Sequence, residues 1–595
     1  MKLLGSIFIY FLITNLLFAA SDIPISTSSG EVFGLKKNRV IIYEDIPYAK
    51  PPIGILRWKA PREITVPTEI ISKKENLCIQ RPTNLGGLDS QEFFVGSEDC
   101  LYLDIFTPKK NVTNNLPVMF WIHGGGNTSG LKDLYDFSKM VSKHNVIVVR
   151  INYRLGPFGW FTHPAIQDLQ EGDDKTSNFG TLDIIMALKW VNKNISNFGG
   201  DPSNITIFGE SAGGHNVLSL LASKKAKDLF HKAISMSGYT TSISTNDAFN
   251  PEKESATSEY ASVKVVDKLS KKFDIDSYSG KDRKHKTREM LLTLSSEDIF
   301  NIYSKRSPYE ELPLLTADGI VIPLIGLKDS LSKKEHVNIV PTIAGSNRDE
   351  VKLWLATARY FVDLDYSLIG SILKIPKVKL INEESFEAFN FYRSSAWKIR
   401  GVDYPLQSLS LAGNKKLYAY RYDWDDHRRY VIANFKKLIG AAHATEIPLL
   451  TGNTDLVGGY PLSDLIYPPS FSKRYTSKNM MRFWTNFAKT GEPGNSTNSI
   501  TWKLYEHSDK SSNYLIIDNK KNLRMKEDSL SYKYLVDQIT VDDRISKLEK
   551  CVVLLQIFTY VGDDLYDENI KNYPGKCIRN DSVDFLKENA SFIEY

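Results

Sequence analysis

Uninterrupted apolar runs alternate with amphipathic stretches along the middle of the chain. Pro117–Ile122 has no polar residue, and Val146–Val149, continued by Ile151, is almost as apolar. Runs of this length without polar alternation are typical of strands covered on both faces, as in parallel sheets. We therefore expect both segments to be buried strands.

A helix is expected after these two strands, over Thr181–Phe198. Its apolar side chains recur at spacings of three and four residues, at Leu182, Ile185, Leu188, Val191 and Ile195. This is the period of an amphipathic helix. Gly199 and Gly200 follow directly, and glycine commonly ends a helix.

Further runs rich in β-branched and aromatic residues complete the pattern. The sequence predicts strands at Val40–Tyr48, Leu101–Phe106, Val337–Ala344, Leu417–Trp424 and Tyr514–Ile517. Between residues 250 and 298 the charges are dense and mixed, which indicates a solvated helical excursion. Apolar strands that alternate with helices predict an α/β protein, with a large, mostly parallel central sheet and helices on both faces.

A short apolar strand beginning at Asn204 leads into the pentapeptide Gly209-Glu-Ser-Ala-Gly213, and a helix-capable stretch, Val217–Ala222, follows. A nucleophile elbow requires this order of strand, sharp turn and helix. Its serine must stand on a strained turn so that the hydroxyl is clear of the backbone, and the flanking glycines let strand and helix pass closely. Ser211 is therefore the candidate nucleophile.

A second glycine motif, His123-Gly-Gly-Gly126, ends the first buried strand. Glycines at this position leave backbone N–H groups unobstructed. We expect the N–H groups of Gly125 and Gly126, with that of Ala212 after the nucleophile, to point at one substrate oxygen. Such an oxyanion hole stabilises the negative charge that develops during acyl transfer.

In α/β-hydrolases, where such elbows occur, the acid and then the histidine follow the serine along the chain. His427 and His507 lie in charged stretches that indicate solvated edges, whereas His443 lies among small residues, so we select His443. The acid is expected in the loop after the strand Val337–Ala344. Asp349 and Glu350 both lie there, and spacing alone does not choose between them.

The chain begins with Met1-Lys2 and an apolar run that ends in small residues around Ala20. This arrangement predicts a cleaved signal peptide over residues 1–20. No other stretch approaches the length of a membrane span, and the C-terminus carries no anchor or retention signal. Since no linker or repeat divides residues 21–595, we expect one domain there, exported as a soluble protein without a stable membrane anchor.

The composition, 42% hydrophobic and 24% charged, is that of an ordinary globular protein. A formal net charge of +5 with interspersed signs, and no basic aromatic stripe, does not favour a nucleic-acid partner. Of the three pairings that four cysteines allow, Cys78 with Cys100 and Cys551 with Cys577 close the shortest loops. Disulfides are expected in an exported chain.

Taken together, the stretches named below resemble the type-B carboxylesterase family, the cholinesterase-related α/β-hydrolases. The resemblance spans nearly all of residues 21–595 and rests on the segments Pro47–Gly54, Ser97–Leu103, Trp121–Gly126, Asn152–Gly156, Asn178–Asp183, Phe198–Pro202, Gly209–Gly214, Gly345–Glu350, His443 and Trp484–Gly491.

The resemblance implies Glu350 as the acid of a catalytic triad, a Cys78–Cys100 disulfide and one large domain. It also implies a supporting hydroxyl and two structural ion pairs, at Ser237, Arg57–Glu98 and Arg154–Asp183. One feature departs from the cholinesterases: the segment between Cys78 and Cys100 contains no tryptophan to stack on a quaternary ammonium group. Choline esters are therefore not the expected substrates.

The sequence as a whole predicts a secreted serine carboxylesterase, extracellular or periplasmic, that acts on small-molecule esters. In this interpretation Ser211 forms the acyl-enzyme, His443 moves the protons and Glu350 orients the imidazole. No metal and no organic cofactor are expected. Alternatives are a lipase or an amidase of the same fold, or a non-catalytic cholinesterase-like adhesion protein. The sequence does not indicate the oligomeric state.

Overall fold

The structure is a computed structural model that describes most of the chain. The described residues are 24–70, 76–83, 92–109, 115–251, 261–271, 273–302, 315–365, 377–430, 433–454, 463, 466–508, 511–560, 563–571 and 573–589. The predicted signal peptide, residues 1–20, lies outside them.

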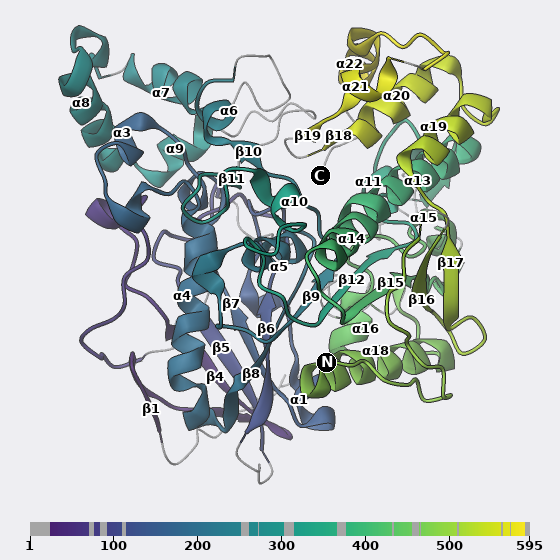
Figure 1. The fold of residues 1–595 in the computed structure, drawn as a ribbon, viewed down its shortest axis with the longest axis horizontal. Coiled ribbons are helices and arrows are strands. Elements are labelled where there is room, and N and C mark those ends of the chain that lie inside the picture. The colour runs from purple at the N-terminus through teal and green to yellow at the C-terminus, as the bar shows by residue number, and fades with distance from the viewer. Residues whose placement is uncertain are drawn as a thin grey trace, which may run out of the picture.

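An 11-stranded sheet runs through the molecule (Figure 1). From one edge to the other its strands are β17 (Arg524–Asp528), β16 (Ser512–Ile517), β15 (Leu417–Tyr422), β12 (Thr342–Asn347), β9 (Lys232–Met236), β8 (Gly200–Glu210), β6 (Leu116–Ile122), β7 (Ile147–Ile151), β5 (Tyr102–Pro108), β4 (Val40–Pro47) and β3 (Leu35–Lys37). The strands from β16 to β7 are all parallel, and the pairs outside them are antiparallel. The predicted mostly parallel sheet is confirmed.

Strand β6 shows why the apolar run Pro117–Ile122 has no polar alternation. Successive side chains point to opposite faces of a sheet. Val118 and Phe120 join one apolar core, and Met119 and Trp121 join another on the opposite face. Because both faces are covered, every position of the strand is buried.

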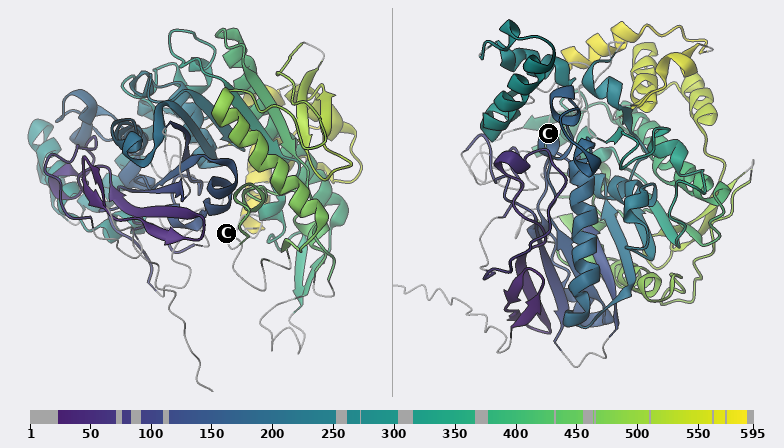
Figure 2. Two further views of the ribbon diagram at one scale, coloured as in Figure 1. Left: turned by 90° about the horizontal axis from the view of Figure 1, so that it is seen from below. Right: turned by 60° about the vertical axis from the view of Figure 1, so that its left-hand side comes forward.

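Helices cover both faces, as predicted (Figure 2). On one face lie α4 (Phe179–Asn194) and α5 (Ala212–Leu221). On the other lie α1 (Ser138–His144), α16 (Ile447–Thr451) and α18 (Phe471–Thr490). The predicted helix Thr181–Phe198 corresponds to α4 and a 3-10 turn, which ends at Gly199 with φ 82°.

One predicted strand has different limits. The sequence predicts a strand over Val337–Ala344, but β12 begins only at Thr342 and continues to Asn347. Proline has no N–H to donate to a ladder, so Pro341 marks the start of the paired region. At the other end, Asn347 pairs with Tyr422 of β15. The later limit carries the strand directly into the loop of the predicted acid.

The charged excursion is helical in its described residues. After α6 (Thr245–Phe249), which precedes it, come α7 (Ser262–Ser270), α8 (Gly280–Thr293) and α9 (Ser296–Ile302). Residues 252–260 lie outside the described part of the chain.

A third apolar core lies beside β12 and under the C-terminal helices, at the upper right of Figure 1. Its helices are α11 (Lys352–Leu355), α13 (Glu383–Lys398), α19 (Tyr532–Val541), α20 (Lys547–Phe558), α21 (Tyr566–Ile570) and α22 (Arg579–Glu588). A π-helical turn, Ile399–Asp403, joins α13 to α14 (Tyr404–Leu411).

Shorter elements complete the fold. They are β1 (Ile25–Thr27), β2 (Gly30–Val32), β10 (Ile243–Ser244), β11 (Thr316–Ala317), β13 (Val362–Asp365), β14 (Lys377–Leu380), β18 (Thr559–Tyr560), β19 (Asp563–Asp564), α2 (Gly156–Gly159), α3 (Pro164–Gln167), α10 (Gly326–Ser330) and α15 (Phe435–Leu438).

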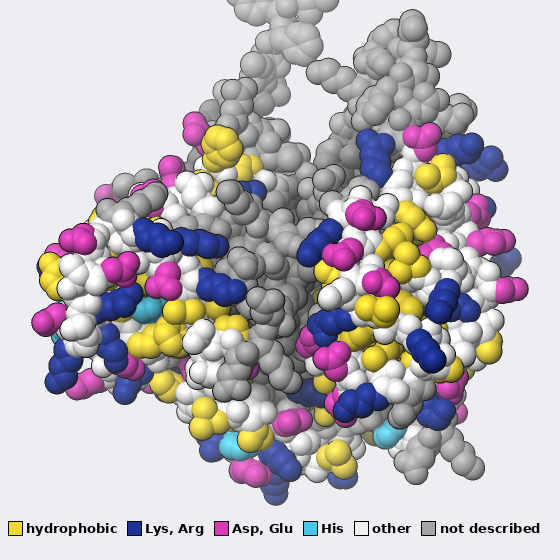
Figure 3. Space-filling model, turned by 90° about the horizontal axis from the view of Figure 1, so that it is seen from above, with side chains coloured by type: hydrophobic (Ala, Val, Ile, Leu, Met, Phe, Trp, Pro, Cys, Tyr) yellow, Lys and Arg dark blue, Asp and Glu magenta, His cyan; other side chains and the backbone are white. Residues whose placement is uncertain are grey.

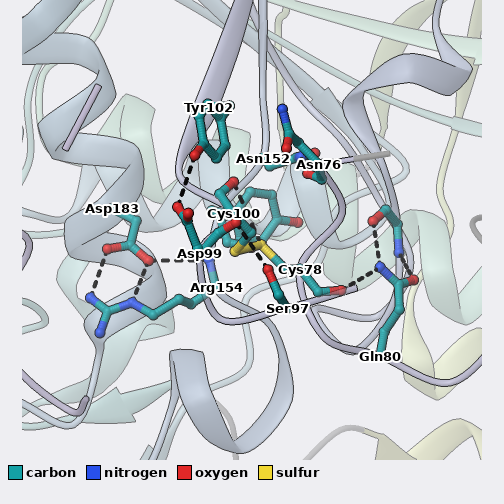
Figure 4. Close-up of a disulfide and its surroundings, with 12 residues drawn as sticks. Asn76, Cys78, Gln80, Ser97, Asp99, Cys100, Tyr102, Asn152, Arg154 and Asp183 are labelled. Carbon is teal, nitrogen blue, oxygen red and sulfur yellow. Dashed lines mark hydrogen bonds and ion pairs between the residues drawn. A yellow bond between two sulfur atoms is a disulfide. The ribbon is translucent and has the colours of Figure 1, made fainter. Parts of the chain in front are cut away.

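The two disulfides that close the shortest loops, Cys78–Cys100 and Cys551–Cys577, are both present. The two implied ion pairs are present as well. Arg154 makes a two-pronged contact with Asp183, with two N–O distances of 2.7 Å, close to the first disulfide (Figure 4). Arg57 contacts Glu98 in the same way, at 2.8 and 2.5 Å. The described part of the chain has no helix long and apolar enough to span a bilayer.

Candidate active site

The predicted elbow lies between β8 and α5. Ser211 is the residue between the two elements and has φ 59° and ψ −123°, a backbone conformation that a non-glycine residue rarely adopts. Its N–H donates to the Met236 carbonyl of the adjacent strand at 2.9 Å, and its carbonyl accepts from the N–H of His215 at 2.9 Å. Neighbouring elements therefore hold the strained turn in place.

The flanking glycines are required by close packing. A Cβ on Gly209 would come within 2.6 Å of both the Gly213 backbone and the Ile122 carbonyl oxygen. A Cβ on Gly213 would overlap that same oxygen at the end of β6. Strand β8, helix α5 and the end of β6 can thus converge only because neither position has a side chain.

The glycine loop after β6 lies directly against the elbow. A Cβ on Gly124 would be 3.0 Å from the Cβ of Ser211. Gly125 and Gly126 follow with φ 103° and 62°, and the Gly125 carbonyl accepts the N–H groups of Thr128 and Ser129, both at 3.0 Å. The predicted oxyanion residues are therefore in a tight turn beside Ser211, and Ala212 opens the helix that follows it.

Gln80, which lies beside the first disulfide, braces the end of this glycine loop (Figure 4). Its Oε1 accepts the N–H of Gly130 at 2.8 Å, and its Nε2 donates to the Gly130 carbonyl at 2.9 Å and to the Cys78 carbonyl at 3.0 Å. The side chain is fully buried. One amide thus joins the disulfide to the loop that carries Gly125 and Gly126.

The predicted acid and histidine are in contact. Nδ1 of His443 lies 2.6 Å from Oε2 of Glu350, and the Glu350 carbonyl accepts the N–H of His443 at 3.1 Å. The other carboxylate oxygen of Glu350 accepts the N–H of Asn347 at 2.7 Å. Both side chains are buried.

The second imidazole nitrogen faces the elbow. Nε2 of His443 lies 3.2 Å from Oε1 of Glu210, the residue before the serine, and forms no hydrogen bond to any described residue, Ser211 included. In free enzymes such catalytic contacts are often long and tighten when substrate binds. The absence of a serine–histidine hydrogen bond therefore does not argue against Ser211 and His443 as catalytic partners.

Asp349, the other acid that spacing allows, has different partners. Its carboxylate accepts the N–H of Ala441 at 3.0 Å and the side-chain amide of Asn390 at 2.7 Å. It therefore supports the loop that carries His443 and does not contact the imidazole itself.

His427 is not at a solvated edge, and this expectation was wrong. It is buried, with Nδ1 2.5 Å from the Ile466 carbonyl and Nε2 2.9 Å from the Gly440 carbonyl. Backbone carbonyls contact both ring nitrogens, so the charged neighbours in the sequence do not reflect its surroundings. His507 is exposed, as expected.

Burial and charge act in opposite directions on the central imidazole. Burial lowers the pKa of His443, but the carboxylates of Glu210 and Glu350 outweigh it and raise that pKa to about 9. Burial also raises the pKa of the Glu210 carboxyl, to about 7. The site thus favours a positive charge on His443, the charge that arises when this residue accepts a proton from a nucleophile.

Glu446 is a third buried carboxyl near the histidine. Its pKa is raised well above the usual value by burial and then by the charges of Glu210 and Glu350. Its Oε2 accepts from the side-chain amide of Asn347 at 2.5 Å. Sequence inspection did not identify it, although it lies only three residues after His443.

The predicted role of Ser237 is not seen in the structure. Its hydroxyl is buried and has no hydrogen-bond partner among the described residues, and the Glu350 oxygens are engaged by Asn347 and His443 instead. The backbone of Ser237, with φ 47°, donates to the Gly345 carbonyl at 2.7 Å. Ser237 therefore contributes through its main chain, which couples the strands that carry the site.

Two tryptophans flank the imidazole. The ring centroids of Trp354 and Trp397 lie 5.2 and 4.8 Å from that of His443. Trp354 follows Glu350 by four residues in α11, whereas Trp397 comes from α13. Neither was identified from the sequence, since an apolar residue in a helix shows the same pattern whether it packs in a core or beside a site.

Comparisons with known proteins identify the family of this chain. The carboxylesterase family model matches residues 21–367 and 399–534. A para-nitrobenzyl esterase of Bacillus subtilis (strain 168) is 31% identical over 517 residues, which cover 83% of this chain and 95% of that protein. Liver carboxylesterase 1F of Rattus norvegicus is 30% identical over 557 residues, covering 85% and 93%.

A solved PNB esterase structure superposes with a TM-score of 0.66 at 28% identity, covering 87% of this chain and 99% of the other. The fold is therefore that of the α/β-hydrolases. The chain belongs to the carboxylesterase family and is a carboxylic ester hydrolase.

Proposed function

We propose that this protein is an exported serine carboxylesterase that hydrolyses small carboxylic esters through an acyl-enzyme on Ser211. The observation that carries the proposal is the 2.6 Å contact between His443 and Glu350, with the second imidazole nitrogen turned toward Glu210, the residue before Ser211 in the elbow. The neighbouring glycine loop supports the same assignment, because its backbone lies against the nucleophile and can supply the N–H donors of an oxyanion hole.

The reaction then proceeds in two halves. His443 takes the proton of Ser211 as the serine oxygen attacks the ester carbonyl, and the oxyanion accepts hydrogen bonds from the N–H groups of Gly125, Gly126 and Ala212. His443 gives that proton to the leaving alcohol. Water attacks the acyl-enzyme in the second half by the same route, while Glu350 holds the tautomer and orientation of the imidazole.

Export is supported by the signal-like sequence of residues 1–20 and by the pairing of all four cysteines. Structural disulfides persist mainly in oxidising compartments. Residues 21–595 form, in this proposal, the single domain of the mature protein.

Replacement of the nucleophile is the direct test. Ser211→Ala is expected to lower kcat for para-nitrophenyl acetate by roughly 10⁶-fold, as for other serine hydrolases, with unchanged thermal unfolding. The same variant should lose covalent labelling by a fluorophosphonate probe. Ser142→Ala is the matched control, because that hydroxyl bonds within α1, to the Lys139 carbonyl, away from the elbow.

Retained turnover in Ser211→Ala would refute the assignment of the nucleophile. An unlabelled, inactive wild-type protein would instead favour the adhesion-protein alternative. A substrate panel separates the remaining classes: para-nitrophenyl and para-nitrobenzyl esters report carboxylesterase activity, emulsified long-chain lipids a lipase, and anilides an amidase.

A further inference from the structure

The chain continues past the region that the family model matches. That match ends at residue 534, near the start of α19. The helices α20, α21 and α22 and the short strands β18 and β19 follow, and the disulfide Cys551–Cys577 closes a loop that contains both strands. We call residues 546–589, as far as they are described, the C-terminal segment.

The C-terminal segment packs on the part of the fold that borders the site. Val552 and Leu555 of α20 share an apolar core with Phe389 and Trp397 of α13. Figure 1 shows β18 and β19 on the side of this helical group that faces the centre of the molecule. The hairpin is therefore directed toward the rest of the chain.

Tyr560 in β18 makes the inward contacts of this hairpin. Its ring centroid lies 5.3 Å from that of Trp397 and 5.4 Å from that of Tyr239, with interplanar angles of 64° and 83°. Edge-to-face arrangements at these distances are favourable contacts between aromatic rings. Tyr560 thus bridges two elements that are far apart in the sequence.

Each of these two rings is linked to a proposed catalytic residue, one by direct contact and the other through one intervening residue. Trp397 packs against His443, with centroids 4.8 Å apart. Tyr239 stacks on His215 at 4.4 Å, and the N–H of His215 donates to the Ser211 carbonyl. Two independent series of contacts, one from the histidine and one from the serine, therefore meet at Tyr560.

Burial indicates the order of these rings. Tyr239 is 3% and Trp397 5% exposed, whereas Tyr560 remains partly exposed. Tyr560 is thus the outer ring, and it covers the two inner ones from solvent.

A residue outside the C-terminal segment also helps to fix the position of Tyr560. Arg400, in the π-helical turn after α13, donates to the Ile557 carbonyl at 2.7 Å. Its guanidinium lies 4.2 Å from the centroid of the Tyr560 ring, a cation–π contact. A ring fixed in this way can act as a rigid wall.

We propose that Tyr560 is a specificity-determining residue: it forms an outer wall of the substrate pocket and restricts the size of the ester group that fits beside Trp397 and Tyr239. The proposal rests on the proposed function, since it assumes that substrate is bound at Ser211. The groups it governs are bulky apolar ones, aryl or branched, because the wall is built of aromatic rings.

The test compares small and bulky esters in the full-length protein. Tyr560→Ala is expected to raise the ratio of kcat/KM for para-nitrophenyl benzoate to that for para-nitrophenyl acetate by about tenfold or more. Tyr560→Phe keeps the ring and should keep the ratio. A second series, methyl against para-nitrobenzyl esters of one acid, examines the alcohol side in the same way.

The matched control is Tyr534→Ala in α19, a tyrosine 40% exposed, which should leave both ratios unchanged. Tyr560→Leu provides a smaller truncation if the alanine variant does not fold, as judged by thermal unfolding. A rise of the bulky-to-small ratio in either series supports the proposal. Unchanged or lower ratios in both series, or an equal loss of activity toward all esters, would overturn it.

Labelling of the wild-type protein separates this inference from the function on which it rests. If a fluorophosphonate labels Ser211 and the wild type hydrolyses esters while the Tyr560 variants keep its ratios, only the role of Tyr560 is wrong. If the wild type is neither labelled nor active, both the proposed function and the role of Tyr560 are wrong.

Discussion

The two disulfide-closed loops of this protein use the same covalent link for different purposes. Their sequence separations are similar, 22 and 26 residues. The first, Cys78–Cys100, lies inside the region that the family model matches and is joined through Gln80 to the glycine loop. The second, Cys551–Cys577, lies outside that region and carries Tyr560.

The difference concerns the part of the site that each loop contacts. The first loop supports the backbone of the site, because the side-chain amide of Gln80 binds the N–H and carbonyl of Gly130 in the glycine loop. Backbone N–H donors stabilise a charge that all ester substrates develop alike. The second loop meets the site through an aromatic side chain, whose shape distinguishes one substrate from another. The first loop should therefore govern rate, and the second selectivity.

Gln80→Leu should have the largest effect on rate. It leaves the buried N–H and carbonyl of Gly130 without their partner, which should lower the free energy of unfolding by about 2–4 kcal/mol. Displacement of Gly125 and Gly126 should lower kcat for all esters by about 10²-fold with little change in KM, since the lost contacts form in the transition state.

Gln170→Leu is the matched control for Gln80→Leu. Gln170 is also buried, and its amide donates to the carbonyls of Trp58 and Asp174, at 3.0 and 2.8 Å, away from the glycine loop. It should lose stability but retain kcat. Steady-state kinetics and urea unfolding check both variants, and an equal loss of kcat in the two would contradict a specific role for Gln80.

Removal of each disulfide in turn tests whether the two loops govern different properties. The double variants Cys78→Ser/Cys100→Ser and Cys551→Ser/Cys577→Ser should each lose roughly 3 kcal/mol of unfolding free energy, because the closed loops are of similar length. Their kinetics should differ. The first variant should lose kcat toward every ester, and the second should change the benzoate-to-acetate ratio while keeping kcat for acetate.

Denaturant unfolding and the ester panel measure these two properties on the same samples. A change of selectivity in the first variant, or a uniform loss of kcat in the second, would mean that the loops do not divide the two tasks.

The sequence predicts the first loop's surroundings far better than the second's, for a physical reason. The elbow around Ser211 and the glycine run ending at Gly126 are local patterns, in which the spacing of glycines reports a backbone geometry directly. The same holds for β6, whose apolar run reports burial on both faces. Even so, the partner of Gln80 is Gly130, fifty residues away, and no local pattern indicates that pairing.

The contacts of Trp397 and Tyr560 depend entirely on tertiary packing. Trp397 lies in an amphipathic helix and Tyr560 in a two-residue strand, so neither position differs in sequence from an ordinary core residue. For His427 the sequence is misleading in another way. Its charged neighbours in the sequence suggest exposure, but the ring is buried and both of its nitrogens contact backbone carbonyls. The limit of β12 at Pro341, by contrast, could have been predicted from the missing N–H of proline.

The smallest expected effect concerns the pH dependence of kcat/KM. It should depend on the carboxylates around His443 and not on either loop. The base form of His443 is neutral, so kcat/KM should rise with pH up to the pKa of His443, about 9. The groups that raise this pKa are Glu210, Glu350 and Glu446, and none belongs to either loop. Loop variants should therefore keep the wild-type midpoint.

Glu210→Gln should move that midpoint. Without this carboxylate the imidazolium loses a stabilising charge, so the pKa of His443 falls and the midpoint shifts to lower pH by on the order of one unit. Profiles of kcat/KM for para-nitrophenyl acetate between roughly pH 5 and pH 10 measure the shift. A shift of the same size in Gln80→Leu or Tyr560→Ala would show that the loops act through the charge on His443, and the division between rate and selectivity would then fail.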